Sequence, residues 1–226
     1  MDENQQAKGH NSQELFRFQA TAPCRYCDAP DLVPVSPAEL ARIADYVGVA
    51  KEEALREYCR HEPLYRYFPR VTLKAGEDGR CPFAADGGCA LRGVRPRACQ
   101  LFPLEATPTV VREKGRKERY EMGYHLAQGI PDAGESYTPE SWETRDGTTF
   151  REAEALEDFI FQSEVLPMCA AMSQKVAHNS LLRELFRRLY SINLGVLYLN
   201  YPDDEPFAEA YVRNRSMVYD LLAAYV

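Results

Sequence analysis

The chain has 226 residues, seven cysteines and a formal net charge of -7. This length is enough for one good hydrophobic core, so the fold does not need disulfides to hold it together. An acidic chain lacks the basic surface that nucleic acids and anionic membranes select, so we exclude both as general partners.

The first residues, 1–13, are polar and carry no apolar run, so we expect a disordered tail with no secretory signal. No later stretch approaches the ~18 uninterrupted apolar residues of a membrane span. These features favour a cytoplasmic protein. In that reducing compartment, an odd number of grouped cysteines indicates metal binding or catalysis before disulfides.

The first grouped cysteines are Cys24 and Cys27, whose Cys-x-x-Cys spacing lets two sulfurs reach one ion from a single tight turn. A thioredoxin-like redox pair is the alternative, but such a pair leads into a helix of a βαβ unit. Here Cys27 leads into Asp28-Ala29-Pro30, which does not favour a helix.

A helical insert follows. Ser36-Pro37-Ala38-Glu39 has the pattern of a capping box that starts a helix, and Gly48 marks its end. Residues 51–60 predict a second short helix that includes Cys59. Residues 65–74 have a strand-like pattern, and the turn at 76–79 then leads to Cys81.

The remaining cysteines of the candidate site lie between Cys81 and Pro103, where Gly88, Gly93 and Pro96 make the backbone turn between thiols. That pattern is typical of a chain that wraps a metal ion. The candidate ligands are Cys24, Cys27, Cys81, Cys89 and Cys99. The alternative, five unrelated cysteines buried for packing, fits poorly with their turn-forming and charged neighbours.

Cys81-Pro82-Phe83 and Arg95-Pro96-Arg97-Ala98-Cys99-Gln100-Leu101-Phe102-Pro103 complete an order that resembles the YkgJ-type cysteine-cluster proteins, described as zinc- or iron-chelating domains. The resemblance spans roughly residues 16–130 and implies a metal site at the five cysteines. The sequence departs from the family pattern at three places. No cysteine precedes Cys24, Asp28 replaces one cysteine of an adjacent pair, and a further cysteine is missing near 127–129.

Several charged or polar residues near these cysteines are further candidates. Asp28 and His125 could add an oxygen or a nitrogen ligand, although a surface or core role is the commoner one for such a histidine. Five arginines could offset the charge of bound thiolates, and Arg95 could also fix its turn. They are Arg25, Arg80, Arg92, Arg95 and Arg97. Cys59 and Cys169 lie in apolar helical patterns, which assigns them to packing.

Beyond Pro103, residues 109–111 and 119–122 predict a hairpin around Gly115. Residues 131–149 are rich in turn formers and indicate a linker or a long loop. From Thr149 a second capping-box pattern begins a helical segment of three helices, and the middle one carries Leu181, Leu182, Leu185, Phe186 and Leu189.

The expected fold class is therefore α+β: a small cysteine-rich metal-site domain (14–130) with a helical insert and short antiparallel strands, then a linker (131–149) and a carboxy-terminal helical segment (150–226) that supplies no ligand. The expected function is metal binding with a structural or metal-handling role, with zinc favoured over iron or an iron-sulfur cluster. Two alternatives stay open. One is an enzyme, either an iron-sulfur oxidoreductase or a protein like the flagellin lysine methylases. The other is an interaction protein that has lost its metal and uses the carboxy-terminal helices.

Overall fold

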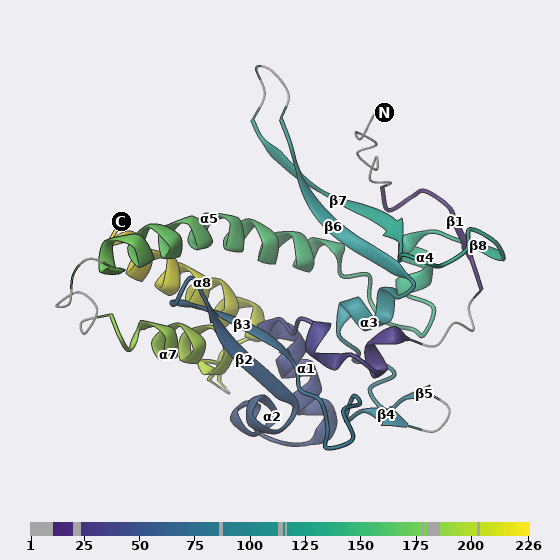
Figure 1. Cartoon of the computed structure of the whole chain (residues 1–226), viewed down its shortest axis with the longest axis horizontal. Coiled ribbons are helices and arrows are strands. Elements are labelled where there is room, and N and C mark those ends of the chain that lie inside the picture. Colours follow the sequence, from purple (N-terminus) through teal and green to yellow (C-terminus); the bar gives the residue numbers. More distant parts are fainter. Residues whose placement is uncertain are drawn as a thin grey trace.

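The computed structural model describes residues 11–19, 24–85, 88–112, 115, 117–177, 179, 186–202 and 204–226. Helices and two-stranded antiparallel pairs alternate along the chain, which confirms the α+β class (Figure 1). Residues 1–10 of the predicted tail lie outside the described residues.

The helical insert forms as its capping residues predict. Two short 3-10 turns, η1 (Arg25–Cys27) and η2 (Pro30–Leu32), precede helix α1 (Pro37–Val47). The Ser36 hydroxyl accepts a hydrogen bond from the Glu39 backbone at 3.2 Å, and the Glu39 carboxylate accepts one from the Ser36 backbone at 2.8 Å. Gly48 ends α1 with φ of 74°, a left-handed conformation that suits glycine.

Helix α2 (Lys51–Tyr58) is shorter than predicted, because Cys59 opens a strand. Strand β2 (Cys59–Leu64), which the sequence did not predict, pairs with β3 (Phe68–Leu73), which lies within the strand expected over 65–74. Tyr65 and Arg66 form the turn between them, both with positive φ. Cys59 is buried and pairs with Leu73 of β3, so strand pairing ends the helix before this residue.

The next elements are short and lie around the later cysteines. Strands β4 (Ala84–Ala85) and β5 (Gly88–Cys89) pair, and helix α3 (Arg97–Leu101) follows. The predicted hairpin around Gly115 is confirmed: β6 (Leu104–Val111) pairs with β7 (Arg119–Leu126) over their full length. This hairpin projects from the body of the molecule (Figure 1).

The segment 131–149, predicted as a linker or long loop, contains regular structure. Strand β8 (Glu135–Tyr137) pairs with β1 (Phe16–Phe18), and helix α4 (Pro139–Glu143) begins at Thr138 with its own capping box. Trp142 is buried against Phe18 with ring centroids 4.7 Å apart. The segment is rich in turn-forming residues, as its sequence shows, but contacts with the distant Phe16–Phe18 strand give it regular structure and pack it on the body of the protein.

The carboxy-terminal segment is helical, as predicted. Helix α5 (Glu152–Ala177) begins three residues after Thr149, so Thr149 does not cap it. Helix α7 (Leu189–Leu194) continues into a π-helical turn, η3 (Gly195–Leu199), and α8 (Phe207–Ala223) lies alongside α5 (Figure 1). Leu181, Leu182 and Leu185 of the predicted middle helix lie outside the described residues.

One hydrophobic core joins the two halves of the chain. Residues of α1, β2 and β3 pack with residues of α5, η3 and α8 in a single buried group. A second group around Phe18, Leu104, Tyr124 and Trp142 lies under β6 and β7. Among the described residues, none of the helices has the length and apolarity needed to cross a membrane.

Candidate metal centre

The Cys-x-x-Cys pair lies on the first 3-10 turn. The backbone N–H of Cys27 donates to the carbonyl of Cys24 at 3.1 Å, which closes the turn. The carbonyl of Cys27 in turn accepts a hydrogen bond of 2.7 Å from the backbone N–H of Cys81. The second half of the site is therefore fixed directly to the first, although 53 residues separate Cys27 from Cys81 in the sequence.

The turn predicted at residues 76–79 forms and leads directly to Cys81. The Gly76 N–H donates to the Arg80 carbonyl at 2.7 Å, and Gly79 adopts φ of 79°. The Cys81 carbonyl then accepts a hydrogen bond from the Ala84 N–H at 3.0 Å, at the start of the β4–β5 pair, in which Cys89 lies opposite Ala84.

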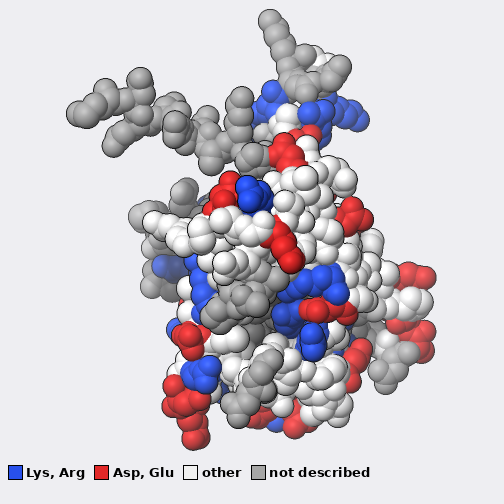
Figure 2. All heavy atoms as spheres, turned by 90° about the vertical axis from the view of Figure 1, so that its right-hand side faces the viewer, with Lys and Arg blue, Asp and Glu red and all other residues white. Residues whose placement is uncertain are grey.

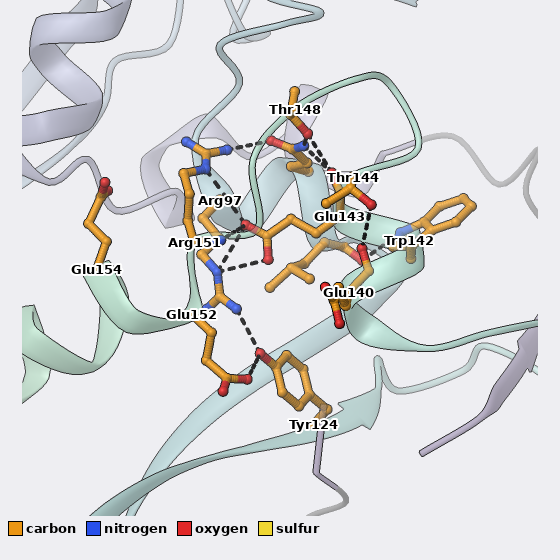
Figure 3. Close-up of polar contacts among 12 residues, drawn as sticks. Arg97, Tyr124, Glu140, Trp142, Glu143, Thr144, Thr148, Arg151, Glu152 and Glu154 are labelled. Carbon is orange, nitrogen blue, oxygen red and sulfur yellow. Dashed lines mark hydrogen bonds and ion pairs between the residues drawn. The ribbon is translucent and has the colours of Figure 1, made fainter. Parts of the chain in front are cut away.

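Helix α3 carries Cys99, and the chain fixes this short helix from two sides. The Glu39 carboxylate that caps α1 also accepts a hydrogen bond of 2.6 Å from the Arg97 backbone N–H, at the start of α3. The Arg97 side chain donates to the buried Glu143 at 3.1 and 3.2 Å (Figure 3). Contacts with α1 and α4 thus hold Cys99 in place.

The five predicted cysteines line one cavity of about 20 Å³. Tyr26, Leu73, Phe83, Leu91, Arg95 and Pro96 complete its wall. A water molecule needs ~10–15 Å³ of such space, so the cavity has room for about one water-sized body. The structure thus brings together Cys24, Cys27, Cys81, Cys89 and Cys99, each partly accessible and each a free thiol.

The thiols do not form a finished ligand set. Across the described part of the chain, no three or more histidine, cysteine, aspartate or glutamate side chains are placed as they would need to be to hold an ion. Metal binding would therefore require the thiols lining the cavity to turn toward a common point. Cys59 and Cys169 lie elsewhere, buried in the core as predicted.

Three of the five thiols are linked by hydrogen bonds, because Cys24 interacts with both Cys99 and Cys27. The bond from the Cys99 thiol is the largest effect on Cys24, and together with the Tyr26 N–H and the charge of Arg95 it lowers the pKa of Cys24 to about 6. The same bond raises the pKa of Cys99. Desolvation raises the pKa of Cys27 to about 11 and also raises the pKa values of Cys81 and Cys89. Cys24 is therefore the thiolate of the group at neutral pH.

Backbone N–H groups point at three of the sulfurs. The sulfurs of Cys24, Cys81 and Cys89 each accept a hydrogen bond from the residue two places later, namely Tyr26, Phe83 and Leu91, and each bond lowers the pKa of its thiol against the opposing effect of burial. Such bonds stabilise the thiolate over the thiol. The turns that carry these cysteines therefore favour the charged form that a metal needs.

Only one of the five candidate arginines lines the cavity. Arg95 does so, and its charge lowers the pKa values of Cys24 and Cys89. We expected Arg95 to fix its turn through backbone carbonyls or sulfurs, but its guanidinium donates to Asp146. Its buried Nε has no hydrogen-bond partner among the described residues. The other four arginines pair with carboxylates: Arg25 with Glu105, Arg80 with Asp28, Arg92 with Asp146 and Arg97 with Glu143.

The two additional donors considered from the sequence lie away from the thiols. The Asp28 side chain is 77% exposed and pairs with Arg80 at 3.2 Å. His125 lies on β7, where its Nε2 is 3.2 Å from a Glu105 oxygen. Neither lines the cysteine cavity.

Sequence reasoning missed a buried ionic network beside the site. Glu143 is fully buried and accepts hydrogen bonds from Arg97 and from the Arg151 backbone, while Tyr124 accepts a bond from Arg97 at 2.8 Å and donates to Glu152 (Figure 3). Gln100, next to Cys99, is also buried and contacts Thr148 and Arg151. The Thr138-Pro139 helix start was the local signal that could have located α4.

The face that carries α4, β1 and β8 has a mixed charge. Basic side chains gather near the middle of this face, and acidic side chains lie directly beside them (Figure 2).

Comparison with known proteins found no matching family model, no matching curated protein and no matching solved structure.

Proposed function

We propose that the chain binds one metal ion through four of its five grouped cysteines, with zinc preferred over iron. The observation that carries this proposal is the cavity that the five thiols share, although they come from four separate segments. If the cysteines served only for packing, we would expect them to be spread through the core, as Cys59 and Cys169 are. The other five instead line one cavity.

The size of the cavity supports a single ion over a cluster. Space for about one water-sized body suits one zinc ion in a tetrahedron of four thiolates, whereas a four-iron cluster brings eight inorganic atoms into the site. The charge of Arg95 supports metal binding in general, because four thiolates around a divalent ion leave a net charge of about -2 that a nearby cation offsets.

The proposal includes a cytoplasmic location, where thiols stay reduced, and a resemblance to the YkgJ-type proteins that rests on the motifs alone. It includes no nucleic-acid partner. A protein partner could use α8, on which Val212, Met217 and Tyr219 are exposed.

The test is anaerobic purification followed by elemental analysis and a visible spectrum. We expect about one zinc per chain and a colourless protein. A brown protein with several irons would instead support the iron-sulfur oxidoreductase or methylase-like alternative. A metal-free protein that takes up neither ion on titration would support the interaction protein.

Matched variants identify the ligands. Cys99→Ser is expected to lose bound metal and to melt at a lower temperature, because the free energy of ion binding contributes to the stability of the folded state. Cys59→Ala is the control, since Cys59 is buried in the core and does not line the cavity. It should lose stability but keep its metal. Equal metal loss in both variants would contradict the ligand assignment.

A further inference from the structure

A second, much larger cavity lies next to the cysteine site. It has a volume of about 570 Å³, and Tyr26 lines both cavities. This volume falls within the range of ~300–1,000 Å³ found for small-molecule sites. Elements from both halves of the chain form its wall, namely η1, η2, α1, β2, β3, α3, the β6–β7 hairpin, α5, η3 and α8.

Most of the wall is apolar. Leu64 and Phe68 contribute from one side, Leu101 and Met122 from another, and Phe161 and Leu197 from the carboxy-terminal helices. Three polar residues of the wall reach the surface: Glu105 and His125 are partly exposed, and Thr107 is exposed. A ligand that fills this space would need a predominantly apolar body.

The acidic groups of the wall are mostly occupied. Arg42 binds both oxygens of Glu154, at 2.7 and 2.9 Å. Both oxygens of Glu39 accept backbone N–H groups, and those of Glu105 face Arg25 and His125. These carboxylates therefore offer little to a ligand.

Asp158 differs from them. Its Oδ1 accepts hydrogen bonds from the Tyr211 hydroxyl and from the Arg215 guanidinium. Within the described residues no hydrogen bond uses Oδ2, although the side chain is only 18% exposed and lines the cavity. Arg215 pairs with this carboxylate through one terminal nitrogen, and its other terminal nitrogen lies 3.8 Å from the solvent-exposed carboxylate of Glu157. Its guanidinium also lies 4.0 Å from the centre of the Tyr211 ring. Oδ2 of Asp158 can therefore accept a hydrogen bond from a ligand, whereas the negative charge of the carboxylate already has Arg215 as its counter-charge.

We infer that this cavity binds an uncharged, largely apolar small molecule whose hydroxyl or amide N–H donates to Oδ2 of Asp158. The apolar wall selects the body of the ligand, and the balanced ion pair disfavours a charged head group, which would be buried without a counter-charge. This site is separate from the proposed metal function and does not depend on it.

The test uses two probes with the same aromatic body. The hydroxyl of 2-naphthol can donate a hydrogen bond and stays uncharged at pH 7, because phenols ionise near pH ~10. In 2-methoxynaphthalene the donor is replaced by an ether. Titration of the full chain, followed by probe fluorescence, should show 2-naphthol binding about tenfold more tightly, the value expected for one hydrogen bond to a charged group.

Asp158→Asn tests the donor site. Tyr211 and Arg215 both donate, so the amide oxygen of the new side chain must face them, and its NH₂ group takes the place of Oδ2. The preference for 2-naphthol should fall from about tenfold to near one. Asp220→Asn, on the exposed side of α8, should keep the tenfold preference. An unchanged preference in Asp158→Asn would overturn the role of Asp158.

A second pair of variants tests the cavity even if Asp158→Asn does not fold. Ala106→Phe on β6 fills part of the wall and should weaken both probes by tenfold or more. Val110→Phe, on the same strand but away from the cavity, should leave binding unchanged. Equal binding of the two probes to the native chain, or equal binding to both phenylalanine variants, would contradict the proposal.

Discussion

At the scale of single residues, the protonation states of the five thiols determine how the proposed ion would bind. Only Cys24 has a lowered pKa, to about 6, while burial or neighbouring thiols raise the pKa values of the other four. A metal binds thiolates, so every protonated ligand must release its proton on binding. Four ligands that include Cys24 therefore release about three protons at pH 7.

We predict that the apparent zinc affinity rises steeply with pH, by about a thousandfold per pH unit between pH 6 and 8, since about three protons leave per ion. Competition with a chelator at pH 6.5, 7.0 and 7.5 measures the slope. Calorimetry in two buffers of different ionisation enthalpy counts the protons directly. An affinity that does not change with pH would mean that the thiols are not the ligands.

The stability of the metal-free protein should fall at high pH, whereas the zinc affinity rises with pH. Cys27 has its pKa raised to about 11 from an ordinary value of 9.0, so the folded state holds this proton more tightly than the unfolded chain does. The stabilisation from this group is complete below pH 9 and is lost as the pH rises from 9 toward 11.

At the scale of helices and strands, α3 depends on the buried carboxylate of Glu143. This side chain has no solvent exposure and contacts Arg97 and Arg151, which are themselves almost fully buried. Burial raises the pKa of Glu143, and the two arginines counteract that effect. Removing the carboxylate leaves two guanidinium groups buried without the anion that pairs with both of them.

We therefore predict that Glu143→Gln lowers the free energy of unfolding by about 3 kcal/mol, as expected when a buried ion pair loses one partner. Urea denaturation measures the change as a lower midpoint with an unchanged slope. Glu140→Gln on the same helix is the control, because Glu140 is exposed and should change stability by less than about 0.5 kcal/mol. Similar losses in both variants would mean that the Arg97 contact contributes little.

How much of these elements the sequence could predict depends on how local their causes are. Ser36, Glu39 and Gly48 determine α1 from within a few residues, and Gly115 does the same for the β6–β7 hairpin. Strand β8 escaped prediction because its partner, Phe16–Phe18, lies about 120 residues earlier. At Gly134 a side chain would meet the Phe18 carbonyl at 2.6 Å, a close approach that only the folded chain reveals.

The same distinction applies to the candidate sites. The cysteine spacing and turn residues indicated a common metal site, and the structure gathers all five cysteines at one cavity. Which carboxylates meet Arg25, Arg80 and Arg95 could not be read from the sequence, since ion pairs join residues that are 51 to 80 positions apart. The cavity at Asp158 also has no local pattern, because helices and strands from both halves of the chain form it.

At the scale of the whole molecule, the carboxy-terminal helices share the core that supports the cysteine site. Phe161, Val165 and Met172 of α5 pack in the same buried group as Leu40 and Leu73, and Cys81, Cys89 and Cys99 pack against that group. The helices supply no candidate ligand, yet their removal would expose the apolar faces of α1 and β3.

A chain shortened to end at residue 148 should therefore lose its cooperative melting transition and aggregate, because too little apolar surface stays buried. Far-UV circular dichroism and size-exclusion chromatography measure both effects. Removal of only the last two residues, which are exposed, should leave the melting transition in place. If the chain ending at 148 stays monomeric, folds and binds zinc, the cysteine segment is an independent domain after all.

The hydrogen bond from the Cys81 N–H to the Cys27 carbonyl has a consequence for how an ion would be captured. Bringing together two thiols separated by a long stretch of chain costs conformational entropy, and that cost grows with the logarithm of the loop length. In this protein the helical insert and the β2–β3 pair have already closed the loop before any ion arrives. An incoming ion then needs only to reorient side chains, so capture and release can both be fast without unfolding the chain around the site.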